Sequence, residues 1–254
     1  EIEERDWSSD VCSSDLMNWY EDQFDKFEVR SRNDVREFNK WIKENPNRSF
    51  DEIGKWGWNI VRSWMHWYGV YTLPTTELND YIFEKFFPED EWPDDRMDNE
   101  VVEIAAGYGM LGRMLGIKMT DSYIQQKNKL VSQYYDLNGQ PRINYPPDVI
   151  HMEANKVPIV YHPHTIIGSY VTWGNKNFDV CMLLGASEHG PIIEDLYEKV
   201  NRIILIGNTT IQAHVTYPIR VYPYVEYKDI PGLITRSKPS ENRIWVWYND
   251  KINF

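Results

Sequence analysis

Two carboxylates frame a loop of small residues near the middle of this chain. Glu103 and Asp121 lie on either side of the segment 105–109, which holds two alanines, two glycines and one tyrosine. Small residues let a ligand approach the backbone of a loop closely, and carboxylates accept hydrogen bonds from hydroxyl and ammonium groups. This combination suits a ligand that carries a ribose diol and a positively charged amine.

The surrounding sequence predicts the elements that position this loop. Residues 101–121 fit a buried strand, the loop, a short helix and a second strand that ends at Asp121. The helix would turn its free N–H groups and the positive end of its dipole toward the loop. In an open α/β sheet, ligands bind at this place, outside the carboxyl ends of the strands.

The loop also carries a family resemblance. Glu103–Gly109 resembles the first motif of class I S-adenosylmethionine-dependent methyltransferases, acid-x-Gly-x-Gly-x-Gly, with Ala105 in place of the first glycine. The resemblance implies S-adenosylmethionine as a small-molecule cofactor, with Asp121 beside its ribose and Glu153 beside its adenine. The candidate cofactor-binding residues are Glu103, Ala105, Gly107, Tyr108, Gly109, Asp121 and Glu153.

Each of the three acids also has a structural interpretation. Glu103, at the end of a buried strand, needs a partner, which is either a ligand ammonium group or a salt-bridge or helix-cap partner within the protein. Asp121 also fits an ordinary helix N-cap. Glu153 is either a neighbour of the adenine or a solvated loop acid. Gly112 lies outside the motif, so Gly112→Ala is expected to have a mild effect on S-adenosylmethionine binding.

The order of the later segments extends the resemblance. Segments 148–154, 177–187 and 200–208 resemble the third, fourth and fifth strands of the family, and segments 219–227 and 243–248 fit an antiparallel hairpin that closes the sheet. The expected fold class is α/β, with a Rossmann-like, mostly parallel sheet, helices on both faces and a C-terminal antiparallel hairpin. A Trp-rich helical segment precedes this sheet.

The resemblance implies that catalysis takes place after the fourth strand. That place holds Glu188 and His189. His189 is the candidate general base, with Glu188 as a second base or as the group that orients it. Both residues also fit a polar turn that caps the next helix. The segment lacks an Asn/Asp-Pro-Pro-aromatic tetrapeptide, which argues against methylation of DNA bases.

His162 and His164 surround a proline without clustered cysteine or carboxylate partners. A histidine pair of this kind is a weak metal signal. We therefore expect a loop beside the pocket and no metal site.

Residues 17–98 are expected to form a helical cap, and residues 99–254 the Rossmann-like domain. A capping box at Ser49–Glu52 precedes an apolar run at helical spacing over residues 53–67. A third helix is expected to begin at Thr75 or one residue later. The tryptophans indicate packing of the cap against the sheet, with an aromatic ligand-binding surface as the alternative.

We expect the first sixteen residues to have a different origin. Residues 6–16, DWSSDVCSSDL, match the frame translation of a common sequencing adapter. We therefore expect residues 1–16 to be a non-native segment and part of the true N-terminus to be missing. Without the six acids and one base of this segment, the net charge changes from −12 to −7.

The remaining chain is acidic, which gives no support for a nucleic-acid partner, although a local basic patch is compatible with it. Without Cys12, Cys181 is the only cysteine, so no disulfide framework is available. No apolar run is long enough to cross a membrane, and the expected location is cytoplasmic. The expected function is methyl transfer from S-adenosylmethionine to an acceptor that the sequence does not identify.

Two alternative functions stay open. Gly107, Gly109 and Gly112 have the spacing of the dinucleotide fingerprint, so an NAD(P)-binding oxidoreductase is one alternative. Asp121 follows Gly107 by only 14 residues, which is shorter than that fingerprint expects. The second alternative is a catalytically inactive methyltransferase-like binding module.

Removing a non-native segment is expected to leave the fold intact. A chain that begins at Met17 should melt at the same temperature as the full chain, because residues 1–16 show no apolar periodicity with which to pack. Thermal melts of both chains make this comparison. A clear loss of stability on truncation would show that the segment belongs to the fold.

Overall fold

The computed structural model describes residues 32–89, 92, 94–137, 142–171, 190–209, 222–235 and 239–249. The segment 1–16, the predicted strand 177–187 and the candidate bases Glu188 and His189 lie outside these residues. In the described part of the chain, no helix has the length and apolar character needed to cross a membrane.

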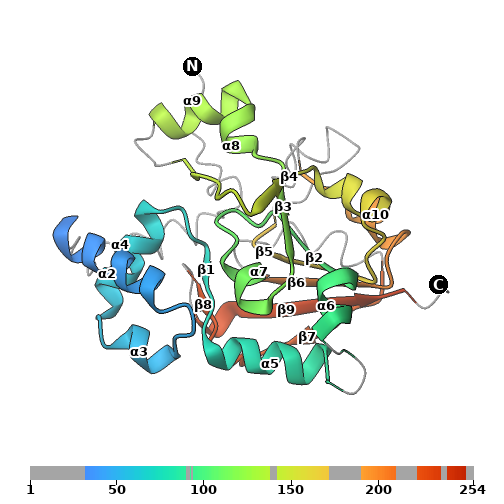
Figure 1. Cartoon of the computed structure of the whole chain (residues 1–254), viewed down its shortest axis with the longest axis horizontal. Coiled ribbons are helices and arrows are strands. Elements are labelled where there is room, and N and C mark those ends of the chain that lie inside the picture. Colours follow the sequence, from blue (N-terminus) through green and yellow to red (C-terminus); the bar gives the residue numbers. More distant parts are fainter. Residues whose placement is uncertain are drawn as a thin grey trace.

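A sheet of seven strands forms the centre of the described residues (Figure 1). Its strand order is β4-β3-β2-β5-β6-β9-β7. The first five strands run parallel, and β9 pairs antiparallel with both β6 and β7. The expected α/β class and C-terminal antiparallel hairpin are confirmed. The strands are β2 (Val101–Ile104), β3 (Lys118–Asp121), β4 (Val149–His151), β5 (Thr165–Ser169), β6 (Arg202–Asn208), β7 (Val225–Tyr227) and β9 (Asn242–Tyr248).

The first strand of this sheet in sequence, β2, lies near its middle. From β2 the chain proceeds outward through β3 to β4, and then returns to β5 on the other side of β2. The direction of strand addition therefore switches between β2 and β5. In open α/β folds, ligands bind at the carboxyl ends of the strands beside such a switch point.

The fourth strand of the sheet differs from the prediction. Its place between β2 and β6 is taken by β5, whereas the predicted segment 177–187 lies outside the described residues. Ile166 and Ile167 of β5 are fully buried, and β5 pairs with β2 over four residues. The short apolar run of β5 was missed because it is only five residues long.

The position of β5 also corrects the expectation for the two histidines before it. Because β5 runs parallel to β2, His162 and His164 lie at its amino end, at the edge of the sheet opposite the glycine loop. The His164 ring packs against Trp92, with ring centroids 4.9 Å apart. The expectation that these histidines lie beside the pocket is therefore wrong.

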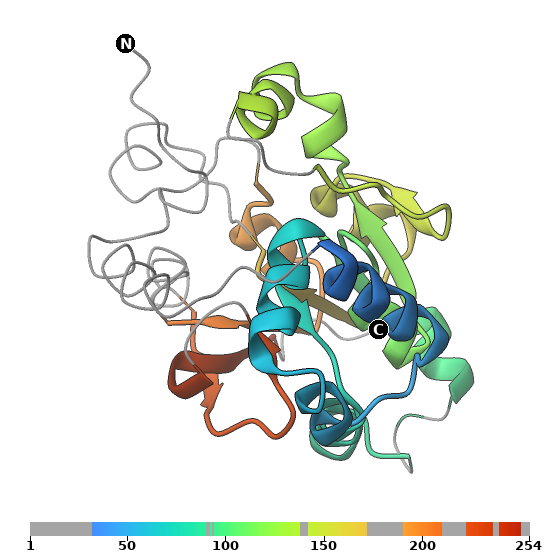
Figure 2. The same cartoon turned by 90° about the vertical axis from the view of Figure 1, so that its left-hand side faces the viewer.

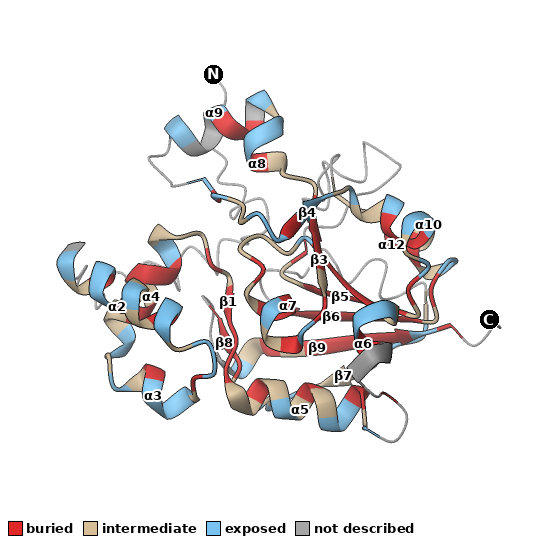
Figure 3. Cartoon of the chain, viewed as in Figure 1, coloured by how far each residue is buried: buried red, intermediate tan, exposed pale blue. Residues whose placement is uncertain are grey.

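Helices cover both faces of the sheet, as expected (Figure 3). One face carries α5 (Thr76–Phe86), α6 (Asp94–Glu100) and α7 (Met110–Leu115), and the other carries α10 (Val157–Val160) and α12 (Ile193–Tyr197). Along β6, Ile204 and Ile206 belong to the first core, and Ile203 and Leu205 to the second. This alternation arises because successive side chains of a strand point to opposite faces.

The N-terminal helices are α2 (Arg32–Glu44), α3 (Phe50–Gly54) and α4 (Trp58–Trp67). The predicted capping box is confirmed, because Ser49 accepts the Glu52 N–H and Glu52 accepts the Ser49 N–H. The predicted run over 53–67 is divided into two helices at Gly57, whose φ is 82°. Gly57 is the N-cap of α4, and its positive φ is a non-helical conformation that glycine adopts readily.

These three helices surround their own apolar core (Figure 2). That core includes Leu73 and Ile234, from the separate two-stranded sheet of β1 (Thr72–Leu73) and β8 (Ile234–Thr235). Tyr108 and Met110, at the start of α7, also pack against it. The expected packing of the cap thus involves the glycine loop and the small sheet.

Four short elements complete the described chain. α8 (Ile124–Lys127) and α9 (Lys129–Leu137) follow β3 and lie beyond the carboxyl end of the sheet in both Figures 1 and 2. A 3₁₀ turn, η1 (Ala154–Lys156), follows β4, and a second, η3 (Pro239–Glu241), precedes β9.

Candidate functional site

The glycine loop leaves β2 in an unusual backbone conformation. Ala105, Gly107 and Gly109 have φ values of 52°, 55° and 67°. L-residues avoid this left-handed region, whereas glycine enters it freely. The alternating glycines of the motif therefore answer a backbone requirement, and Ala105 adopts the same conformation at the position of the missing first glycine.

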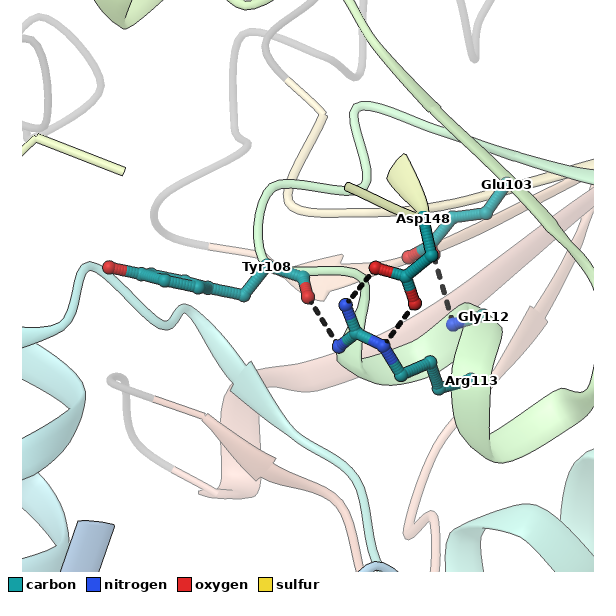
Figure 4. A network of polar contacts seen from close by, with 5 residues as sticks. All are labelled: Glu103, Tyr108, Gly112, Arg113 and Asp148. Atoms are coloured by element: carbon teal, nitrogen blue, oxygen red, sulfur yellow. Dashed lines mark hydrogen bonds and ion pairs between the residues drawn. The ribbon is translucent and has the colours of Figure 1, made fainter. Parts of the chain in front are cut away.

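Glu103 holds the helix that follows the loop. Its side chain is 2% exposed, and Oε2 accepts the N–H of Gly112 at 2.9 Å, in the first turn of α7 (Figure 4). Burial, with a smaller contribution from the nearby Asp121, raises the pKa of Glu103 to about 8, although the Gly112 N–H and Arg113 oppose the shift. Of the interpretations drawn from the sequence, the helix-cap partner is the one that this contact matches.

Asp121 ties the loop to the end of β3. Its Oδ2 accepts the Gly107 N–H at 3.0 Å, and its Oδ1 accepts the Tyr123 N–H at 2.8 Å. Burial raises the pKa of Asp121, although these two N–H groups and the Tyr145 hydroxyl oppose the shift. The residue at the cap position of α8 is Tyr123, so Asp121 supports the turn before that helix.

An ion pair that the sequence analysis missed fixes the loop from outside. Arg113 donates two hydrogen bonds to Asp148, Nε to Oδ2 at 2.6 Å and Nη2 to Oδ1 at 2.8 Å. Its Nη1 donates a third to the Tyr108 carbonyl at 2.6 Å (Figure 4). Both side chains are more than 40% exposed, so the pair contributes more to loop geometry than to stability.

Tyr108 joins the loop to two other parts of the protein. Its half-buried ring packs against the core of the helical cap. Burial raises the pKa of its hydroxyl, and the nearby Asn144 backbone N–H opposes this shift. The loop, the cap and the segment before β4 therefore meet at this side chain.

Glu153 lies two residues beyond the end of β4, at the same edge of the sheet as Asp121. The backbone N–H of Met152 donates to the Asp121 carbonyl at 2.8 Å. The exposed Glu153 carboxylate pairs with Lys156 at 3.0 Å. This contact matches the interpretation of Glu153 as a solvated acid.

One edge of the sheet thus collects every candidate cofactor-binding residue. Glu188 and His189 lie outside the described residues. Within the described ranges, no group of three or more histidine, cysteine or acidic side chains is placed to hold a metal ion.

No family model and no curated protein matches the sequence. Among solved structures, Thermoplasma acidophilum 1320 is 12% identical over 70% of this chain and 91% of that chain, with a TM-score of 0.35. The CMeT domain of the citrinin polyketide synthase is 12% identical over 74% of this chain and 55% of that chain, with a TM-score of 0.36. Human N-acetylserotonin methyltransferase, in complex with SAM, is 9% identical over 87% of this chain and 68% of that chain, with a TM-score of 0.31. Similarity at this level decides neither fold nor function, so both rest on the residues described above.

Gly112 lies too close to its neighbours to accept a side chain without cost, whereas the mild effect of Gly112→Ala on cofactor binding stays a prediction. A Cβ on Gly112 would lie 2.3 Å from Cγ of Met119 and 2.6 Å from Oε2 of Glu103. We expect Gly112→Ala to destabilise the fold by about 1–3 kcal/mol, as overpacking does. Ala105→Gly should stabilise the fold slightly or leave its stability unchanged. The change relieves about 1–2 kcal/mol of strain from the left-handed backbone, but the more flexible glycine costs about 0.5–1 kcal/mol of chain entropy on folding. Urea unfolding of both variants tests this contrast, and equal losses would contradict it.

Glu103 is expected to make the stability of the fold depend on pH. The pKa of a glutamate in an unfolded chain is about 4.3, whereas the pKa of Glu103 in the folded protein is raised to about 8. The folded state binds the extra proton between these values, so its stability falls as pH rises through this window. Glu103→Gln removes the titration and retains an acceptor for the Gly112 N–H.

The variant should therefore gain stability over the wild type between about pH 5 and about pH 8. At about 1.4 kcal/mol per pKa unit, the gain amounts to a few kcal/mol. Denaturant unfolding of both proteins at several pH values measures the difference. A difference that stays constant with pH would show that Glu103 is ionised in the folded protein.

Proposed function

We propose that this chain binds S-adenosylmethionine at the carboxyl ends of β2, β3 and β4, and that it is a methyltransferase. The observation that carries the proposal is the left-handed loop at the switch point, whose Gly107 N–H is held by Asp121. A ligand can lie against a backbone without side chains there, next to a carboxylate that accepts hydroxyl groups. These features suit the ribose and the amino-acid moiety of the cofactor.

Several residues have separate roles in this proposal. Gly107 and Gly109 allow the cofactor to approach the loop, and Asp121 accepts hydrogen bonds from the ribose hydroxyls. Glu103 acts as a positioning residue, since its carboxylate holds α7 behind the loop. Glu153 stays a proposed neighbour of the adenine. Ala105 and Tyr108 contribute backbone to the same surface.

The bound cofactor would supply a methyl group on a positively charged sulfur, which a nucleophilic acceptor attacks. The chain would then have to orient the acceptor and take up its proton. His189 is the proposed base, with Glu188 as the second base or the orienting group. The acceptor is proposed only as an oxygen, nitrogen or carbon nucleophile.

One observation favours a dinucleotide as a second candidate ligand. Gly112 packs directly against β3, which is the role of the third glycine in the dinucleotide fingerprint. Two features support S-adenosylmethionine instead. Asp121 follows Gly107 by 14 residues, against about 20 in dinucleotide sites. The antiparallel strand β9 also lies between β6 and β7, whereas the strands of the usual dinucleotide sheet follow one another outward in sequence order on this side.

Calorimetric titration with S-adenosylmethionine, S-adenosylhomocysteine and NAD separates these candidates. We expect both adenosyl compounds to bind and NAD not to bind. In Asp121→Asn, the carboxylate loses its charge and one acceptor, which costs about 1–3 kcal/mol. The affinity for S-adenosylhomocysteine should then fall about ten- to hundredfold.

The matched control is Asp80→Asn, at an exposed position of α5, which should bind as the wild type does. A thermal melt of each variant checks the fold. Unchanged affinity in Asp121→Asn would mean that Asp121 only supports the loop. Binding of NAD alone would replace the methyltransferase proposal by the dinucleotide one.

A further inference from the structure

The segment 142–148, which leads into β4, crosses the glycine loop. Ile143 in this segment is buried at 7% exposure. Its Cδ1 lies 3.4 Å from the position that a Cβ on Gly107 would occupy. The open side of Gly107 is therefore covered by a side chain of the protein itself.

Tyr145, two residues further on, lies beside the carboxylate of Asp121. Its hydroxyl opposes the rise in the pKa of that carboxyl that burial causes, whereas the hydrogen bonds that Asp121 accepts come from the N–H groups of Gly107 and Tyr123. A carboxylate offers about four lone-pair sites, so these two N–H groups leave about two. A ribose diol needs two sites, and the Tyr145 hydroxyl is the neighbour of those sites that can leave without breaking the loop.

The ring of Tyr145 is stacked on Tyr123, with centroids 4.0 Å apart and an angle of 10° between the planes. Tyr123 in turn packs against His151, at 4.8 Å between centroids. An adenosine would present the same two features, a flat aromatic ring and a hydroxyl group next to the Asp121 carboxylate. Tyr145 thus has the chemistry of an internal substitute for adenosine.

Two exposed ion pairs, Arg142–Asp136 and Arg113–Asp148, anchor the two ends of the segment, and exposed pairs of this kind contribute little to stability. Between these ends, neutral hydrogen bonds hold the segment in place. The Ile143 N–H donates to Oε1 of Gln125 at 2.9 Å, and the Ile143 carbonyl accepts from Nε2 of Gln126 at 3.0 Å. Each such bond contributes about 0.5–1.5 kcal/mol, so a bound ligand can displace the segment.

We propose that the segment 142–148 is a plug that occupies the cofactor site of the free protein and is displaced by an adenosine-containing ligand. This inference rests on the proposed function, because it concerns the same site. The plug lowers the apparent affinity by the fraction of molecules in which the site is open. Any contact that draws the segment away from the loop would then activate binding.

The test measures the affinity for S-adenosylhomocysteine in two plug variants. Tyr145→Phe removes the hydroxyl that competes for Asp121 and keeps the ring, and Tyr145→Ala removes both. A plug closed in about nine of ten molecules weakens binding about tenfold, so both variants should bind more tightly, by up to about tenfold. Tyr145→Ala should show the larger gain.

Tyr197→Phe is the matched control, because it removes a hydroxyl that donates to the Tyr248 carbonyl at 3.0 Å, away from the loop. Its affinity should equal that of the wild type. If the wild type binds and Tyr145→Phe binds equally or more weakly, the plug is wrong and the proposed function stands. If neither the wild type nor any folded plug variant binds, both proposals are wrong. Tyr145→Phe keeps the stacked ring, so it decides the question even if Tyr145→Ala does not fold.

Discussion

The backbone of the glycine loop must hold three left-handed residues within five positions, and two buried carboxylates fix it in that state. Asp121 accepts the N–H of Gly107, in the middle of the loop, and Glu103 accepts the N–H of Gly112, just after it. Burying a carboxylate is costly unless it is hydrogen-bonded. The pKa of Glu103 is raised because its hydrogen bond from Gly112 and the nearby Arg113 offset only part of the cost of burial. Shifted pKa values of this kind are common at functional sites.

The other parts of the fold depend on the loop that these acids hold. The parallel strands bring both acids to the same region of the sheet, and the tight packing of Gly112 on β3 brings α7 close enough for the Glu103 contact. The helical cap packs on Tyr108, and Arg113 connects the loop to Asp148 before β4. A ligand that moves the loop would therefore also move the contacts that the loop makes with the cap and with the segment 142–148.

The sequence predicted the parts of this site that have local causes. The buried strands, the capping box at Ser49–Glu52 and the alternating glycines follow from burial pattern, hydrogen-bonding side chains and backbone conformation within a few residues. The catalytic assignment of Glu188 and His189 stays a prediction.

Features that depend on contacts between distant residues were missed or mistaken. Arg113 and Asp148 are 35 residues apart, and the packing of Gly112 against Met119 depends on how closely α7 approaches β3. The short strand β5 took the place predicted for a longer apolar segment because sheet pairing, rather than length, decides which run is used. Tyr145 belongs to a polar stretch whose pattern predicts nothing, and only the fold brings it to Asp121.

The central claim is that an adenosine-containing ligand binds against the backbone of this loop. Nuclear magnetic resonance of isotope-labelled protein tests it most directly, by following the backbone amides during titration with S-adenosylhomocysteine. The account predicts that the amide signals of Gly107 and Gly109 shift with the largest amplitude and saturate together. A saturating titration that leaves these two signals unmoved, or that shifts only the amides of the helical cap, would contradict it.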